Sequence, residues 1–218
     1  MRWTSVLACV LSGAWLSGCG SSSGQDMSLL RVPVGNSPQR GPSDAWVTLV
    51  EFADFECSYC RAEEPVITDL EAAYGADLRL IFKYFPLTDI HPHAEAAAVA
   101  AECAGEQGKF WEMHDLLLTT PLDSGTLLAD AQAVLGLDIE KWQACLQTSE
   151  AASVVDADVA LGLSLGVDGT PTFVINGVPV LGAVPEGQLR GAVEQARATA
   201  IASGVPRADY YDKVILGL

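Results

Sequence analysis

The chain has 218 residues, of which 50% are hydrophobic, and a formal net charge of -16 from 28 acidic and 12 basic side chains. This apolar content can fill the core of one domain of ordinary size and argues against disorder over the whole length. The excess of negative charge would repel nucleic-acid phosphates and anionic lipid headgroups, so neither is an expected ligand.

The first nineteen residues have the pattern of an export signal. Arg2 lies near the start, an apolar run extends from Val6 to Leu16, and small residues precede Cys19. The run is too short to span a bilayer. Its end, LSGC, resembles the bacterial lipoprotein signal, which is cleaved before a cysteine that is then acylated. The alternative is an ordinary secretory signal in which the cysteine is coincidental.

Export changes what the cysteines are expected to do. Cys9 would leave with the signal and Cys19 would carry lipid, so four of the six cysteines would remain as thiols: Cys57, Cys60, Cys103 and Cys145. Disulfides persist outside the cytoplasm, and an even number of thiols permits two of them.

A β-α-β unit is predicted in the first half of the chain. The β-prone run Val47–Phe52 predicts a strand buried on both faces. A helix is expected from about Cys57 to Tyr74, with Gly75 as its stop, and Leu78–Phe85 predicts a second strand. A unit of this size suits a parallel pair of strands, which is typical of an α/β domain.

The second half of the chain begins with helices and ends with a hairpin. Four alanine- and leucine-rich helices are predicted between Ala94 and Leu163, the fourth being a single long helix capped by Asp138. Asn176-Gly177 between two β-prone runs predicts a tight β-hairpin. A last helix is expected over Glu186–Ser203.

Cys57 and Cys60 form a Cys-X-X-Cys pair, which could be a reactive disulfide, part of a metal site or a structural staple. Their position favours the reactive disulfide. Cys57 falls where a buried strand meets the start of a helix, and there free backbone N–H groups and the helix dipole stabilise a thiolate. Cys60, one turn further on, should be more buried. This chemistry predicts Cys57 as the attacking thiol and Cys60 as the resolving thiol.

Gly169-Thr170-Pro171-Thr172 precedes the hairpin, and with this order of elements the sequence resembles the DsbA-like thiol oxidoreductases of the thioredoxin superfamily. The resemblance implies an α/β thioredoxin fold, a central mixed β-sheet flanked by helices, with an inserted all-helical domain. The expected division of the chain is a signal peptide (1–18), a lipid anchor and flexible tether (19–41), the N-terminal part of the thioredoxin fold (42–92), the helical domain (93–165), the C-terminal part of the fold (166–203) and a C-terminal tail (204–218).

The resemblance also assigns site residues. Pro171 matches a cis-proline that lies against the active-site pair, and Thr170 would offer backbone atoms to an extended substrate. Ser58 and Tyr59, between the two cysteines, join them as expected substrate-binding residues. Glu51 matches a buried acid, and Lys83 matches a lysine that accompanies that acid. An exposed strand pair of little consequence is the alternative for these two residues.

Cys103 and Cys145 are the remaining thiols. The DsbA-like branch often carries cysteines at such positions of its helical domain, where they can form a disulfide. Chain entropy then suggests up to roughly 4 kcal/mol of stabilisation. Two buried free thiols that behave as small hydrophobic residues are the alternative.

The sequence thus predicts an enzyme, a dithiol-disulfide oxidoreductase and preferably an oxidase, that exchanges disulfides with cysteines of exported proteins. It needs no bound cofactor, and a redox partner must reset Cys57 and Cys60. The expected place is the periplasmic face of the cell envelope, with the outer membrane favoured for the anchor at Cys19. An envelope thiol reductase or a disulfide isomerase is the alternative within this class. A copper- or zinc-handling lipoprotein that uses Cys57, Cys60 and His91 or His93 is the alternative from another class.

Overall fold

The computed structural model describes residues 29–123 and 125–218, so Cys19 and the predicted signal lie outside the described residues. The described chain is built on one five-stranded sheet with the strand order β1-β3-β2-β4-β5. Its strands are β1 (Gln39–Arg40), β2 (Val47–Ala53), β3 (Leu78–Tyr84), β4 (Thr172–Ile175) and β5 (Val178–Leu181).

The sheet is mixed, as the sequence predicts. The central strands β2 and β3 run parallel, whereas β4 is antiparallel to β2, β5 to β4 and β1 to β3. All residues of β2 and β3 are buried, which explains their near-continuous apolar sequence. The predicted β-α-β unit is therefore confirmed.

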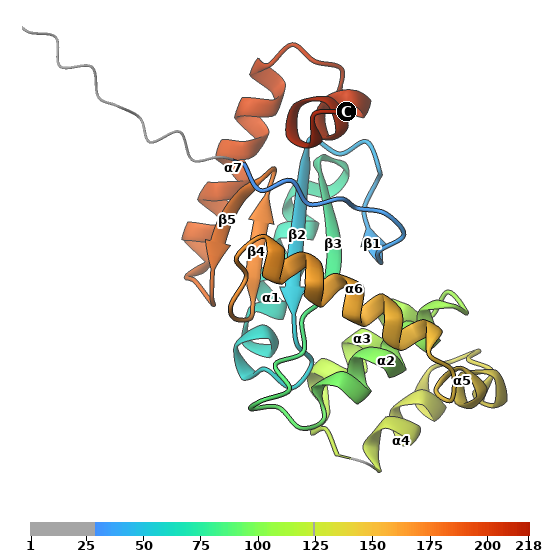
Figure 1. Cartoon of the computed structure of the whole chain (residues 1–218). Coiled ribbons are helices and arrows are strands. Elements are labelled where there is room, and N and C mark those ends of the chain that lie inside the picture. The colour runs from blue at the N-terminus through green and yellow to red at the C-terminus, as the bar shows by residue number, and fades with distance from the viewer. Residues whose placement is uncertain (1–28, 124) are drawn as a thin grey trace, which may run out of the picture.

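Helices cover both faces of the sheet, and a further group of helices lies beyond one end of its strands. In Figure 1, α6 crosses one face of the sheet, α1 lies on the other, and α2 to α5 form a separate block below the strands. The helices are α1 (Ser58–Tyr74), η1 (Gly75–Asp77), α2 (Ala94–Gly105), α3 (Phe110–Thr119), α4 (Thr126–Ala133), α5 (Ile139–Cys145), α6 (Glu150–Ser164), α7 (Glu186–Ala202), α8 (Arg207–Tyr210) and η2 (Tyr211–Leu216).

Successive residues of β2 point to opposite faces of the sheet, and this alternation later decides which charged groups can meet. Leu49 packs with apolar side chains of α1 and α7, including Ile67 and Leu189. Val50 and Phe52 pack on the other face, which α6 covers. Glu51, between them in sequence, shares the face of Leu49 and α1.

The hairpin that follows the helical block is confirmed. Asn176 and Gly177 form its turn with φ values of 44° and 84°, the left-handed backbone that Asn and Gly tolerate best. The Asn176 side chain also accepts a hydrogen bond from the backbone N–H of Thr48 at 2.8 Å. This contact fixes β4 against β2 at the end of the sheet far from the cysteines.

The helical block has its own apolar core. Trp142 of α5 is buried there, and its indole N–H donates to the carbonyl oxygen of Ala100 on α2 at 2.9 Å. A disulfide between Cys103 and Cys145 joins the ends of the same two helices. The block is thus held by packing and by a covalent link between α2 and α5.

The prediction of one long fourth helix is wrong, because the segment forms two helices, α5 and α6. Asp138 does cap α5, accepting from the backbone N–H of Lys141 at 3.1 Å. The break follows Cys145, where the Thr148 hydroxyl donates to the carbonyl oxygen of Cys145 at 2.8 Å. Ser and Thr side chains that bond the nearby backbone compete in this way with helix continuation.

Parts of the predicted tether and of the C-terminal tail are packed against the fold. The tether assignment of 19–41 is wrong for its last part, since Val32 is fully buried and β1 pairs with β3. The C-terminal tail, 204–218, is a packed helical segment whose Tyr211 hydroxyl donates to the carbonyl oxygen of Val32 at 2.8 Å. The two ends of the described chain therefore stabilise each other. No helix in 29–123 or 125–218 has the length and apolarity needed to cross a bilayer.

Candidate active site

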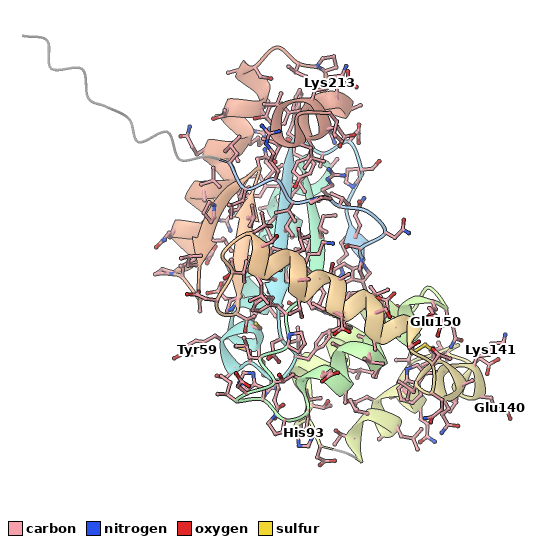
Figure 2. The ribbon with its side chains drawn as sticks, viewed as in Figure 1. Tyr59, His93, Glu140, Lys141, Glu150 and Lys213 are labelled. Carbon is pink, nitrogen blue, oxygen red and sulfur yellow. A yellow bond between two sulfur atoms is a disulfide. The ribbon has the colours of Figure 1, made fainter. Side chains whose placement is uncertain are left out.

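Cys57 and Cys60 lie where β2 gives way to α1. Cys57 is the N-cap residue of α1 and Cys60 lies in its first turn, and both are free thiols. Cys57 is only 4% exposed and Cys60 less. The two residues between them form the accessible rim: Ser58 is exposed, and Tyr59, which is 63% exposed, projects from the start of α1 into solvent in Figure 2.

The two thiols are strongly unequal. A hydrogen bond from the Cys60 thiol, helped by Thr170 and by the backbone N–H groups of Tyr59 and Cys60, lowers the pKa of Cys57 to about 5 despite its burial. The same bond, together with burial and the charge of Glu51, raises the pKa of Cys60. One thiol is thus a thiolate at neutral pH, whereas the other holds its proton, which is the asymmetry that disulfide exchange requires.

The loop before β4 lies directly against Cys57. The Thr170–Pro171 peptide bond is cis, and in its thiol form Cys57 donates from Sγ to the carbonyl oxygen of Thr170 at 3.4 Å. The Pro171 carbonyl oxygen accepts from the backbone N–H of Gly182 beyond β5. The backbone beside the reactive thiol is thereby held by the edge of the sheet.

Two acids that precede Cys57, Asp54 and Glu56, bind its loop to the segment that enters the helical block. The Asp54 carboxylate accepts from the backbone N–H groups of Glu56 at 2.7 Å and Leu87 at 2.8 Å, and it lies 2.7 Å from His91 Nδ1. The Glu56 carboxylate accepts from the backbone N–H of His93 at 2.7 Å. The charge of Glu56 is therefore engaged with a backbone donor.

The histidines of the metal hypothesis are not assembled with the cysteines. His91 is bound to Asp54, and no group of three metal-ligating side chains in 29–123 and 125–218 includes Cys57 or Cys60. A Cys2His2 arrangement needs four such ligands around one point. This geometry does not favour metal binding at the cysteine pair.

Glu51 lies beneath the cysteines and is 2% exposed. Its Oε2 atom is buried without a hydrogen-bond partner among the described residues. Burial, followed by the nearby charges of Glu64, Glu63 and Glu71, raises the pKa of Glu51 well above its usual value. Burial therefore favours the neutral form of this acid, which lies close to Cys60.

The prediction that Lys83 accompanies Glu51 is wrong. In the parallel register Glu51 is opposite Phe82 and Phe52 is opposite Lys83, so the acid and the lysine point to opposite faces of the sheet. Lys83 Nζ instead lies 2.8 Å from the Asp158 carboxylate of α6, in a pair that is nearly inaccessible to solvent. Asp158 also accepts from the backbone N–H of Tyr84.

Breaking the Lys83–Asp158 pair should have a large effect on the free energy of unfolding and none on the rate of disulfide exchange. Lys83→Met should lower the free energy of unfolding by about 3–5 kcal/mol, because it leaves the Asp158 carboxylate buried without its cation. Denaturant unfolding measures this loss, and the double variant Lys83→Met/Asp158→Asn should recover part of it. A Lys83→Met protein as stable as the wild type would show that the pair does not hold α6 to the sheet.

A family model described as Thioredoxin matches residues 34–195, which is more than half of the chain. The chain belongs to the thioredoxin family. Among solved structures, a thioredoxin-like oxidoreductase from Silicibacter pomeroyi DSS-3 is 34% identical with a TM-score of 0.69, and the match covers 78% of this chain and 96% of that one. The catalytic domain of Proteus mirabilis ScsC is 25% identical with a TM-score of 0.66, over 78% and 93% of the two chains. This thioredoxin-family chain thus shares its fold with a thioredoxin-like oxidoreductase over nearly the whole length of that protein.

The matched curated relatives are larger proteins. The Na(+)/H(+) antiporter NhaA 3 of Salinispora tropica is 46% identical over 140 residues, which make up 63% of this chain and 21% of that protein. The chain spans about a fifth of the length of the first curated relatives it matches. This thioredoxin-family chain matches only one part of each of these larger proteins. Their ion transport is therefore not inferred for it.

Two candidate functional residues, Asp54 and His114, could not be identified from the sequence. Asp54 stands three residues before Cys57, and its spacing alone gave no reason to single it out. His114 stands at helical spacing with Phe110 and Trp111, which is the pattern of a helix core or rim. The side chain is indeed fully buried, but its Nε2 atom has no partner in the described part of the chain, which a purely apolar role does not explain.

Proposed function

We propose that the chain passes a disulfide from its Cys57–Cys60 pair to cysteines of exported proteins, and so acts as an oxidase. The observation that carries the proposal is the inequality of the two thiols, with the pKa of Cys57 at about 5 and that of Cys60 raised. A stable thiolate is a good leaving group, and stabilising it favours the reduced form of the enzyme. Electrons then flow from the substrate to the enzyme.

The exchange proceeds in two steps. A substrate thiolate attacks Cys57 Sγ, the Cys57–Cys60 bond breaks, and the Cys60 sulfur leaves and takes up a proton. A second substrate thiolate then attacks the substrate sulfur of the mixed disulfide, and Cys57 leaves as a thiolate. The substrate has lost two electrons and gained a disulfide, and the enzyme holds two reduced cysteines.

A redox partner that bears a disulfide resets the pair by the reverse chemistry. The Cys57 thiolate attacks the partner, and Cys60 then resolves this mixed disulfide by attacking Cys57. Cys60 must lose its proton to do so, and the Glu51 carboxylate, once ionised, is the proposed acceptor, because it lies close enough for its charge to raise the pKa of Cys60. Lys83 has no part in this transfer, because it lies on the other face of the sheet.

The proposed substrate surface surrounds Cys57. The backbone of Thr170 and Pro171 would pair with an extended peptide, and the contact of Cys57 Sγ with the Thr170 carbonyl oxygen supports this position. Ser58 and Tyr59 would line the other side, which their exposure supports.

Reduced, unfolded protein substrate is the reagent that tests the direction of exchange. The oxidised enzyme should convert substrate thiols to disulfides with a stoichiometry of one disulfide per enzyme, as counted by alkylation and mass spectrometry. Substrate thiols that stay free, while the reduced enzyme readily opens a substrate disulfide, would identify a reductase. Recovery of activity only from a scrambled substrate would identify an isomerase.

We also propose that the protein is held at a membrane of the cell envelope by a lipid on Cys19, facing the periplasm. The support is the LSGC sequence at the end of the apolar run. Cys19→Ala should yield a protein without lipid that partitions into the soluble envelope fraction, whereas the wild type sediments with membranes. Sedimentation of the variant with membranes would contradict the anchor.

A further inference from the structure

His114 is a buried imidazole that the exchange chemistry described above does not use. It lies on α3, which packs against α1, and its side chain is 0% exposed. Four aromatic rings surround it, those of Phe55, Phe82, Phe110 and Trp111, with ring centroids 5.0 to 5.8 Å away. Burying a polar ring nitrogen in such an apolar cage costs free energy unless the nitrogen is hydrogen-bonded.

The hydrogen bonding of His114 fixes its tautomer. Nδ1 lies 2.9 Å from a carboxylate oxygen of Asp115. Because a carboxylate only accepts hydrogen bonds, Nδ1 carries the hydrogen, and in the neutral ring Nε2 then presents a free lone pair. Nε2 is buried and has no partner within the described residues. The Asp115 carboxylate thus orients the ring through Nδ1 and leaves Nε2 as the nitrogen that can accept a proton.

Glu51 occupies the same face of the sheet as His114. In the register of β2 and β3, Glu51 is opposite Phe82, and opposed residues share a face. The rings of Phe82 and His114 pack edge to face, with their centroids 5.3 Å apart. Two buried polar atoms that have no partner among residues 29–123 and 125–218, Glu51 Oε2 and His114 Nε2, therefore lie in one layer between the sheet and the helices. One atom belongs to a proton donor and the other to an acceptor.

Further charged groups connect this layer to solvent. Single side-chain atoms of Glu64 on α1, His114 and Asp115 lie within 4.8 Å of one another. Arg40 of β1 lies 2.8 Å from Asp115, 3.5 Å from Glu71 and 3.9 Å from Glu64, so it supplies the positive charge that these acids need. The Asp115 side chain is 56% exposed. A proton that reaches His114 is one hydrogen bond from the surface.

We propose that His114 is a positioning residue for the resolving step, which takes the proton of Glu51 at Nε2 and releases a proton from Nδ1 toward Asp115 and solvent. The Glu51 carboxylate so formed accepts the thiol proton of Cys60. The Cys60 thiolate attacks Cys57 Sγ, the mixed disulfide breaks, and the partner leaves as a thiolate. One proton moves from Cys60 to solvent, and two electrons move from the enzyme pair to the partner.

The state of Glu51 explains why a second group is needed. Burial and neighbouring acids raise the pKa of Glu51 and so favour its protonated form, which must give up its own proton before it can act as a base. A neutral imidazole with a free lone pair accepts that proton, directly or through one water. The inference rests on the proposed function, because it concerns the resolving step of the Cys57–Cys60 pair.

His114→Gln tests the inference, because the amide can bond Asp115 but does not titrate. The attack of Cys57 on a small disulfide should keep its wild-type rate. The resolving step should slow by about a hundredfold, the lower end of the range of general acid-base effects, and its rate should depend on pH differently from the wild type. Stopped-flow measurement of both steps from acidic to alkaline pH gives the two profiles.

Two further variants on α3 keep the inference testable if His114→Gln does not fold. Asp115→Asn removes the carboxylate that orients His114 and should displace the pH profile of the resolving step. Glu112→Gln removes another exposed acid of the same helix, which pairs with Lys109, and should leave the profile unchanged. Wild-type resolving rates and pH profiles in Asp115→Asn, or in cooperatively folded His114→Gln, would overturn the inference alone. A wild-type protein that exchanges no disulfide would overturn it together with the proposed function.

Discussion

Cys57→Ser is expected to reduce thiol-disulfide exchange to the uncatalysed background, whereas Cys60→Ser should accumulate mixed disulfides. The reason is the division of labour between a thiolate with a pKa of about 5 and a buried thiol whose pKa is raised. Without Cys57 no sulfur attacks or is attacked, and without Cys60 the first exchange occurs but the covalent complex is not resolved. Acid quenching, alkylation and non-reducing electrophoresis separate these species.

Wild-type protein alkylated at Cys57 is the control and should behave like Cys57→Ser. The rate of alkylation at Cys57 should also follow its pKa. It should be nearly constant above about pH 6 and fall as pH drops through about 5, because the thiolate is the reacting form. Equal trapping by the two serine variants would contradict the assignment of attacking and resolving thiols.

Glu51→Gln is expected to slow the resolving step by about a hundredfold while changing the first attack only slightly. Gln has the shape of the neutral acid that burial enforces, so the fold should tolerate it, but an amide cannot accept the proton of Cys60. The two exchange steps, followed by stopped-flow across pH, report the effect separately.

Glu63→Gln is the matched control for Glu51→Gln. Glu63 is also a buried acid close to Glu51, but its carboxylate accepts from the backbone N–H of Val184 and has no role in the proposed transfer. This variant should therefore slow the resolving step far less than Glu51→Gln, because it removes only one of the neighbouring charges that raise the pKa of Glu51. A resolving step in Glu51→Gln with wild-type rate and pH profile would reduce Glu51 to a structural residue of β2.

Local sequence signals predicted the parts of the fold that local physics determines. The strand that precedes Cys57, the helix stop at Gly75 and the turn at Asn176-Gly177 each depend on a few neighbouring residues, and the structure has all three. The pairing of Glu51 with Lys83 failed because the register of two parallel strands is not a local property. A shift of one residue sends a side chain to the other face, and packing of α1 and α6 decides the register.

His114 shows a second limit of sequence reasoning. At helical spacing with Phe110 and Trp111 it has the pattern of a core residue, and it does lie in the core. Only the three-dimensional structure shows that His114 contacts Phe82, which is opposite Glu51, and that both polar side chains have buried atoms without partners in the described chain. The long-range packing of β1 and of the C-terminal helices was hidden for the same reason.

The equilibrium between the protein and glutathione redox buffers tests the central claim most directly. Alkylation and mass spectrometry should show Cys57 joined to Cys60 in one reversible two-electron transition. Its potential should be less negative than about -270 mV, the value typical of thioredoxin, because stabilisation of the Cys57 thiolate favours the reduced form. Cysteines that stay free at every buffer composition, or a pair more reducing than that value, would contradict an oxidase built on Cys57 and Cys60.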